Sequence, residues 1–312
     1  MRICRLAFTD VRSIMGHIYE NCYKLVETVR REINEYSAGL LAGTDTSGKF
    51  SNGHIVDKIN ASQRFIHSIL MKYIPEEFQT SASLTSVSSV FTLPWDFGTL
   101  IQFEDENKRK VFPSSVKNLP TTGSSGSDQI YYRKGRTLVL NKSGVTKTYT
   151  LLYYSKPRDM NFGQAQAGSG ASTLILQNVS KAKDDYYNGV IVENYTAAFE
   201  SEITDYVAST YTATITGTAT ADDWYGMVSE MPEEFHFLIP YWAVLLLKEH
   251  PASQEKPNNR EYAHFQEMLT SALTGFVGND NDVNPADIWT DFGQCPSPSS
   301  GHDIPGQGYL IY

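Results

Sequence analysis

The stretch from Ile55 to Phe97 constrains the fold most, because the spacing of its apolar residues changes once from a helical to a strand-like period. In its first half apolar residues recur every three or four positions, as on one face of an α-helix, at Ile55, Ile59, Phe65, Ile66, Ile69 and Leu70. We expect Ser51 or Asn52 to cap this helix and Pro75 to stop it. From Ser81 onward, alternating apolar residues among Ser and Thr predict strands that lead into the turn at 93–97.

The same two periods divide the rest of the chain. Helical spacing covers 10–41 and returns after Asp222, where 237–247 is the most apolar run and is expected to be a buried helix. Between these parts, strand-like runs form two groups separated by a loop over 161–172 that is rich in Gly, Gln, Ala and Ser. We therefore predict an α+β fold: a helical bundle formed by the N- and C-terminal helices, with an inserted antiparallel β-domain and an extended C-terminal arm.

The predicted divisions follow these changes of pattern. They are 1–80 for the N-terminal helices of the bundle, 81–160 for the β-rich insertion, 161–222 for a second β-module, 223–277 for the C-terminal helices of the bundle, and 278–312 for the arm.

The chain is acidic, which limits the partners it is expected to bind. Its 312 residues are 41% hydrophobic, enough for a substantial core, and its net charge is −9. A protein that grips phosphates usually has an excess of Lys and Arg, so tight, sequence-specific DNA binding is not expected. Cys4, Cys22 and Cys295 are too scattered for a disulfide framework or a zinc site, which favours a reducing cytoplasm. No apolar run approaches the ~20 residues that span a bilayer, and the N-terminus lacks the pattern of a secretory signal, so no membrane partner is expected.

Two segments resemble ligand-binding loops but lack the context that those loops need. The segment 43–49 fits the first seven positions of a phosphate-binding loop, yet Phe50 replaces the hydroxyl residue that holds magnesium, and a helix instead of a strand precedes it. Asp280, Asp282 and Asn284 have the spacing of calcium ligands, but Pro285 stands where that loop needs glycine.

Candidate nucleophiles, bases and metal ligands likewise lie outside the sequence patterns that catalytic and metal sites need. None of the seven histidines lies in a zinc-binding pattern, and the Ser and Gly clusters at 123–128 and 167–172 lack the strand-to-helix elbow of a serine nucleophile. Glu104 to Glu106 and the basic residues 108–110 are expected to form a charged hairpin tip, and Asp184-Asp185 a turn. We assign no catalytic, cofactor-binding or metal-binding residue and expect neither a cofactor nor enzymatic activity.

Four motifs together are similar to those of one known group of proteins. They are Ile59-Asn60-Ala61, Leu93-Pro94-Trp95-Asp96-Phe97, Tyr153-Tyr154-Ser155-Lys156-Pro157, and the pair 184–195 and 203–217. The last is similar to a β-module of phage structural proteins, although Ala208 stands where that module has glycine and 194–201 replaces its Gly-rich stretch. In these features the chain resembles the head-to-tail adaptor proteins of tailed bacteriophages, which form rings beneath the portal.

The resemblance implies a structural virion protein at the head-to-tail interface, assembled in the host cytoplasm. It implies a homo-oligomeric ring of about twelve copies that binds the portal protein and a tail or neck protein, with two different complementary faces on each subunit. Viral DNA would pass through the lumen without specific binding, and a lumen lined by carboxylates would suit this because it repels phosphates.

Two sets of residues are candidates for contacts in such an assembly. In these rings the C-terminal arm reaches toward the portal, and we expect Tyr309, Leu310, Ile311 and Tyr312 to anchor it in an apolar groove. Trp95 and Phe97 are either core residues that close the sheet or anchors of a subunit or portal contact.

Two other functions remain open at this point. One is a tail-side neck or fibre-attachment protein of the same virion, which binding to the tail tube instead of the portal would reveal. The other is a tail-associated hydrolase, which would need a set of catalytic residues in a recognisable arrangement.

Overall fold

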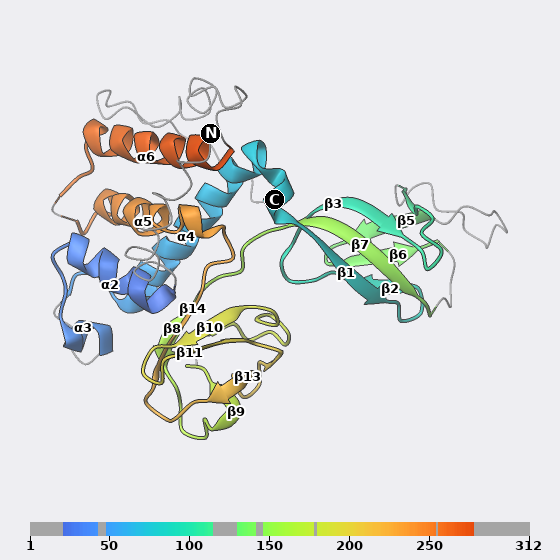
Figure 1. Cartoon of the computed structure of the whole chain (residues 1–312), viewed down its shortest axis with the longest axis horizontal. Helices are drawn as coiled ribbons and strands as arrows, with labels where there is room; N and C mark the ends of the chain where they lie inside the picture. The colour runs from blue at the N-terminus through green and yellow to red at the C-terminus, as the bar shows by residue number, and fades with distance from the viewer. Residues whose placement is uncertain are drawn as a thin grey trace, which may run out of the picture.

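The computed structural model describes residues 21–42, 48–114, 130–141, 146–177, 180–253 and 255–277. Within these ranges the chain has two separate hydrophobic cores. The larger core lies in a body made of helices and small sheets, and the smaller one lies in a β-domain that extends to one side of it (Figure 1). We call residues 79–155 the projecting domain and the rest of the described chain the body.

The helices of the body begin where the sequence supplies caps. They are α2 (Cys22–Glu32), α3 (Ala38–Ala42), α4 (Asn52–Tyr73), α5 (Leu238–Glu249) and α6 (Asn259–Val277), with short 3₁₀ turns at η1 (Pro75–Phe78) and η3 (Glu233–Phe235). The Asn21 side chain accepts a hydrogen bond from the Lys24 amide at 3.0 Å, and the Ser51 hydroxyl accepts one from the His54 amide at 3.2 Å. The predicted cap at Ser51 and the stop before Pro75 are confirmed.

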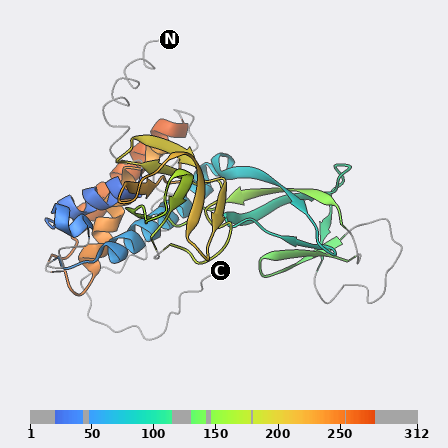
Figure 2. The ribbon, with the colours of Figure 1, turned by 90° about the horizontal axis from the view of Figure 1, so that it is seen from below.

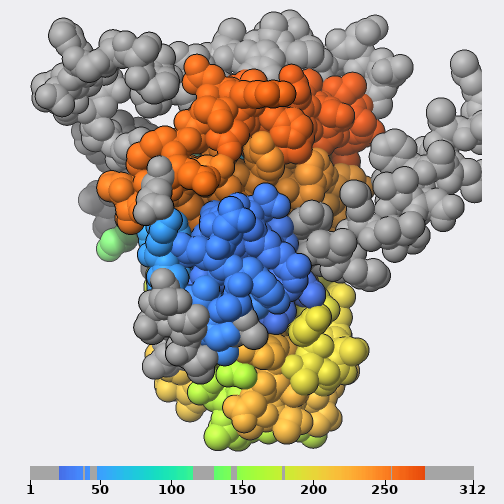
Figure 3. Space-filling model, turned by 90° about the vertical axis from the view of Figure 1, so that its left-hand side faces the viewer, coloured from blue at the N-terminus to red at the C-terminus, as the bar shows by residue number. Residues whose placement is uncertain are grey.

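Helices from both ends of the sequence share the larger core. In α4, Ile55, Ile59 and Ile66 are fully buried, and the apolar run predicted as a buried helix forms α5. Helix α2 packs on α4 and α5 on one side and on two strands of the body, β8 (Phe162–Gln164) and β14 (Trp224–Met227), on the other. Figure 3 shows this arrangement from the side, with α2 between α5 and α6 above and the body's strands below.

The prediction that the N- and C-terminal helices form a helical bundle is wrong. Within the described ranges the helices are few, and α4 crosses α5 and α6 at an angle instead of lying alongside them (Figure 1). Cys22, Leu25, Val26 and Val29 of α2 are all buried, and they fill a core that strands share with helices. The described part of the chain is therefore a mixed fold of helices and four small sheets. The prediction failed because a periodic apolar face identifies which residues a helix buries but not which elements they pack against.

Two small antiparallel sheets complete the body. The first has the order β11-β10-β14-β8 and the second β12-β13-β9. Their strands are β8 (Phe162–Gln164), β9 (Ala171–Ile175), β10 (Ile191–Asn194), β11 (Phe199–Glu202), β12 (Asp205–Val207), β13 (Thr212–Thr218) and β14 (Trp224–Met227). Two expectations fail here. Strand β8 lies inside the predicted loop 161–172, and β14 lies where a helix was expected to resume.

The projecting domain encloses its own core between two sheets (Figure 2). These have the orders β1-β7-β3 and β2-β6-β5-β4, and β4 runs parallel to β5. Their strands are β1 (Gln79–Thr85), β2 (Val90–Thr92), β3 (Phe97–Glu104), β4 (Phe112–Pro113), β5 (Ile130–Lys134), β6 (Thr137–Leu140) and β7 (Thr148–Ser155). Rings of Phe91, Phe103 and Tyr149 fill the centre. The predicted hairpin tip at 104–110 is confirmed, and β5 and β6 form a second hairpin that turns at Lys134-Gly135.

The chain enters and leaves the projecting domain through neighbouring strands. It enters through β1 and leaves through β7, which pair from Gln79 with Tyr154 at the body to Thr85 with Thr148 at the far end. We call these the near end and the far end of the projecting domain. Both connections to the body therefore lie at the near end.

Candidate functional site

The four motifs that carry the family resemblance come together where the projecting domain meets the body. Asn60 lies on α4, Asp96 precedes β3, Tyr153 lies on β7, and Tyr186 lies in a turn of the body. Hydrogen bonds and ring contacts connect all four stretches to the segment 156–160 or to one another. We call this meeting place the junction.

Helix α4 holds the segment that follows β7. The Asn60 amide group makes two hydrogen bonds with the backbone of Met160: it donates to the carbonyl at 3.0 Å and accepts from the N–H at 2.8 Å. Gln63 donates to the Arg158 carbonyl at 2.8 Å and accepts from the Ser229 hydroxyl at 2.6 Å. Both side chains are buried, so each bond satisfies a group that water cannot reach.

Asp96 connects the start of β3 to the end of β7. Its carboxylate accepts a hydrogen bond from the Tyr153 hydroxyl, 3.0 Å from either oxygen, and its carbonyl accepts one from the Lys156 amide at 2.7 Å. Burial raises the pKa of the Asp96 carboxyl, while the charge of Arg158 and the hydrogen bond from Tyr153 oppose the rise. Burial and the Asp96 charge in turn raise the pKa of Tyr153. The Tyr153 hydroxyl therefore stays protonated and donates its hydrogen to the Asp96 carboxylate.

Arg158 and Asp159 connect the same segment to the body through charged groups. The Arg158 guanidinium donates to Glu230 at 2.9 Å through Nε and also to the Asn188 carbonyl. Asp159 forms ion pairs with Arg64 and with Lys181, the latter at 2.7 Å. Side chains from α4 and from two turns of the body thus hold one five-residue segment.

Trp95 lies at the junction, partly exposed. Its indole N–H donates to the Asp184 carbonyl at 2.9 Å, and its ring lies 5.6 Å from that of Tyr186. The guanidinium of Arg136 lies 3.0 Å from the ring centroid and the Lys183 ammonium 5.0 Å. Trp95 therefore makes contacts within the subunit that connect the projecting domain to the body.

The other predicted contact residues have different outcomes. Phe97 is buried in the smaller core, with its ring 5.4 Å from that of Tyr153. A contact of Trp95 or Phe97 with another subunit or with the portal stays a prediction. Tyr309, Leu310, Ile311 and Tyr312, like the whole predicted arm 278–312, lie outside the described residues.

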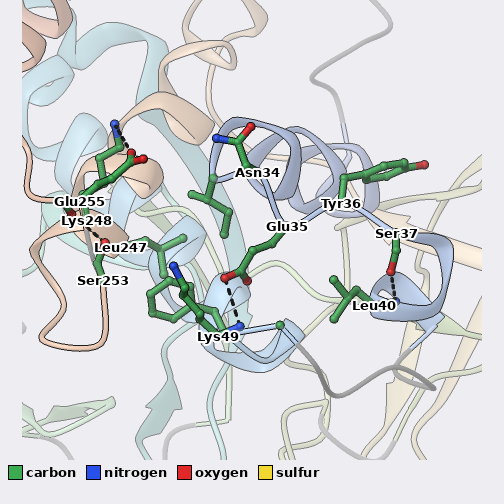
Figure 4. A pocket seen from close by; sticks show the side chains of 13 residues that line it. Asn34, Glu35, Tyr36, Ser37, Leu40, Lys49, Leu247, Lys248, Ser253 and Glu255 are labelled. Atoms are coloured by element: carbon green, nitrogen blue, oxygen red, sulfur yellow. Dashed lines mark hydrogen bonds and ion pairs between the residues drawn. The ribbon is translucent and has the colours of Figure 1, made fainter.

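A pocket of about 510 Å³ lies on the body near the N-terminal end of α4 (Figure 4). It lies between the C-terminal ends of α2 and α5, and Ile33, Leu40, Phe50 and Leu247 supply its apolar wall. Lys49, from the end of the loop that resembles a phosphate-binding motif, directs its backbone N–H to Glu35 at 3.1 Å. Ser51 caps α4 beside it, so this helix start is occupied by a side chain of the chain itself.

The reactive residue types seen in the sequence have structural partners. The His67 ring lies 3.0 Å from the Ser155 carbonyl and the His236 ring 2.7 Å from the Met231 carbonyl, and burial lowers the pKa of both. Asp105 of the acidic trio accepts backbone hydrogen bonds from Asn107 and Arg109 in the hairpin turn. Within the described ranges, no three His, Cys, Asp or Glu side chains are placed to hold a metal ion. The calcium-like motif at 280–284 lies outside these ranges.

Comparisons with known proteins give no assignment. No family model matches the chain, and no curated protein matches it either. In the part of the chain that the structure describes, no helix is both long and apolar enough to cross a lipid bilayer.

Sequence reasoning found some residues of the junction and missed others. Asn60, Asp96 and Tyr153 belong to motifs that were singled out, but only as marks of resemblance. Arg158, Asp159 and Glu230 were not singled out. The available signal was the charged pair Arg158-Asp159 directly after Pro157, in a segment too short to form an element of its own.

Proposed function

We propose that this protein is a structural connector of a tailed-phage virion, an adaptor that links the portal to the tail. The observation that carries the proposal is the convergence of the four resemblance motifs at the junction. Residues scattered from Asn60 to Tyr186 hold one domain at a fixed position on another. Such an arrangement supports a role in which the relative position of two parts matters.

The two parts of the chain also differ in charge. Residues 79–155 contain nine Lys and Arg against five Asp and Glu, a net charge of +4, whereas the remainder of the chain carries −13. A ring of identical subunits needs two different and complementary faces on each one, since head-to-tail contacts must close. A basic projecting domain and an acidic body supply two such faces.

In this proposal about twelve copies form a ring on the portal, and the DNA passes through the lumen without specific binding. The acidic body suits a lumen that repels phosphates. The arm with Tyr309, Leu310, Ile311 and Tyr312 extends to the portal, and a tail or neck protein binds the opposite side. The protein then resides at the head-to-tail interface of the virion.

Electron microscopy of the protein mixed with its cognate portal tests this proposal. We expect an added ring with discrete rotational symmetry on the portal. A well-formed portal without a ring would contradict the connector role and favour the tail-side neck or fibre-attachment role, which binding to purified tail tube would then test.

The contribution of the arm is tested in the same assay. Deleting residues 300–312, or replacing Leu310 and Ile311 with Ser, should weaken portal binding because it removes the apolar anchor, while circular dichroism of the subunit stays unchanged. A Ser299→Ala, Ser300→Ala variant is the matched control and should bind normally. Unchanged binding by the deletion variant would show that the arm is not the anchor.

A further inference from the structure

A group of cations without carboxylate partners lies at the near end of the projecting domain. We call it the basic cluster, and it consists of Arg133, Lys134, Arg136, Lys156 and Lys183. Arg136 and Lys183 flank the Trp95 ring, 3.0 Å and 5.0 Å from its centroid. Among the described residues none of the five forms an ion pair with a carboxylate, whereas Lys108 and Lys147 at the far end both do. Burial also lowers the pKa of the Arg136 guanidinium, so an anion beside it would stabilise its charged form.

The acidic residues next to the basic cluster in the sequence already accept hydrogen bonds. Asp96 accepts one from a tyrosine hydroxyl, as described above. Asp184 accepts one from the Ala208 amide at 2.7 Å, and Asp185 accepts one from the Asn188 side chain at 2.9 Å. Even with these three carboxylates counted, the cations of the cluster are in excess.

The predicted arm, 278–312, has the opposite charge. It contains five Asp and no Glu, Lys or Arg. Four of the five lie close together, at Asp280, Asp282, Asp287 and Asp291. No other stretch outside the described ranges has a net charge below −1. The arm is therefore the part of the chain whose charge best complements the basic cluster.

Helix α6 brings the start of the arm toward the junction. The Phe276 ring, one residue before the end of α6, lies 5.5 Å from the ring of Phe235. Phe235 follows Glu230 by five residues, and Glu230 pairs with Arg158 at the junction. Figure 1 shows this end of α6, in red, on the side of the body toward the projecting domain. The chain from Phe276 to Asp291 can extend over roughly 50 Å, which is enough to reach the basic cluster.

We propose that residues 280–291 of the arm bind the basic cluster of the same chain, with their carboxylates beside its ammonium and guanidinium groups. Exposed ion pairs are individually weak. Because the segment is covalently attached, its effective concentration at the cluster is of the order of mM, and several weak pairs then suffice to hold it.

Two observations favour this occupant over a nucleic acid. Arg136 lies 3.0 Å from the centroid of the Trp95 ring, so it covers a face on which a base would otherwise stack. The chain outside residues 79–155 has a net charge of −13, which would repel a long polyanion more than a short segment held at one place.

This contact goes beyond the connector function and does not depend on it. Docking of residues 280–291 leaves Tyr309 to Tyr312 outside the contact, available as the portal anchor proposed above. In a connector, the contact would fix the place from which the end of the arm leaves the subunit.

Cross-linking of the full chain with a carbodiimide, followed by mass spectrometry, tests whether the two segments meet. The reagent joins a carboxylate directly to an amine in contact with it. We expect links from residues 280–291 to Lys134, Lys156 or Lys183, with a yield that falls in ~1 M salt. Lys110 at the far end is the internal control and should not link. The yield should not change on dilution, because both groups belong to one chain.

A fluorophore on Cys295 measures how freely the arm rotates. The label is placed in a Cys4→Ser background, where Cys22 does not react because it is fully buried. Replacing the four Asp residues of 280–291 with Asn should shift the docking equilibrium roughly tenfold toward the free arm and lower the fluorescence anisotropy. Asp303→Asn is the matched control, since it removes the same charge from the arm beyond the docked segment, and should leave the anisotropy unchanged.

The basic cluster is tested in the same assay. Replacing Lys134, Lys156 and Lys183 with Gln should lower the anisotropy to a similar extent. The matched control is an Arg109→Gln, Lys110→Gln variant, which removes positive charge from the far end and should behave as the wild type. Circular dichroism of each variant checks that the subunit remains folded.

Three results would overturn the inference. They are a wild-type protein without links between the arm and the cluster, an anisotropy that neither set of substitutions lowers, and a link yield that rises with protein concentration, which would assign the arm to a second copy. Duplex DNA that binds the wild type but not the Gln variant, while the arm rotates freely in both, would assign the cluster to nucleic acid. None of these experiments uses the portal, so failure of this contact and failure of the connector role are separate.

Discussion

Single residues at the junction combine a structural role with sensitivity to pH. The Asp96 carboxylate is partly buried, and its pKa is raised, so its folded-state value lies above its unfolded one. A carboxyl group of this kind contributes stability below its unfolded pKa, about 3.9, and that contribution is lost as the pH rises through the folded value. The Tyr153 hydroxyl limits this loss by donating to the ionised group.

Tyr153→Phe should therefore destabilise the protein more at neutral than at acidic pH. We expect a loss of about 1.5–3 kcal/mol at pH ~7, where the hydrogen bond has a charged acceptor, and about 0.5–1.5 kcal/mol at pH ~4. Urea unfolding at both pH values measures the difference. Tyr154→Phe is the control, since the Tyr154 hydroxyl has no hydrogen-bond partner among the described residues. Equal losses at both pH values would show that Asp96 is not the relevant acceptor.

Between elements, one glycine sets how closely α2 approaches the body's first sheet. Gly226 lies on β14, where a Cβ atom would come within 2.8 Å of both the Asn21 side-chain oxygen and the Tyr23 amide nitrogen. The second atom belongs to the backbone of α2 and cannot rotate away. The helix can therefore pack on β14 only because residue 226 lacks a side chain.

Gly226→Ala should separate α2 from β14 and cost about 1–3 kcal/mol in the free energy of unfolding. Thermal or urea unfolding followed by circular dichroism measures it. Gly275→Ala on α6 is the matched control: its added methyl group meets nothing within 4 Å, so the same exchange should stabilise the helix by about 0.5–1 kcal/mol. A neutral Gly226→Ala variant would indicate that α2 can shift without loss.

The elements that the sequence predicts well are those in which a regular apolar spacing continues over many residues, or those with distinctive turn residues. Helix α4 has an apolar stripe and a Ser cap, and the β5–β6 hairpin has Lys134-Gly135, where Gly135 takes a positive φ of 58°. Strand β8 was missed because its three residues lie within a Gly- and Gln-rich stretch and are too few to show an alternating pattern. Strand β14 was missed because its four residues come shortly before a strong helical pattern. The bundle was wrong because the apolar face of α2 packs on strands as well as on helices.

At the junction, sequence reasoning located several side chains but not their partners. The motif around Trp95 was expected to be either core or interface, and the structure instead uses Trp95 between two parts of one chain. The ion pairs of Arg158 and Asp159 join residues far apart in the sequence, and no local pattern records such distant pairs.

The molecule as a whole has two cores that can respond separately to a mutation. Phe91 is fully buried in the projecting domain, against the rings of Phe103 and Tyr149, and Phe265 is fully buried in the body. No described residue of one core belongs to the other. Local opening of one should leave the other closed.

Phe91→Ala should cost about 3–5 kcal/mol and act on the projecting domain alone. Hydrogen exchange measured by mass spectrometry should show faster exchange in β1, β3 and β7 and unchanged exchange in α4 and α5. Phe265→Ala should give the reverse pattern. Faster exchange throughout the chain in either variant would mean that the two cores unfold as one cooperative unit.

The neighbouring entry and exit strands of the projecting domain also determine how it bears a load. A force that pulls the far end away from the body acts along β1 and β7, and both strands run unbroken between the two ends. The covalent backbone of both strands carries the tension, and the hydrogen bonds between the strands are perpendicular to the direction of the force. The domain should therefore resist stretching along its long axis.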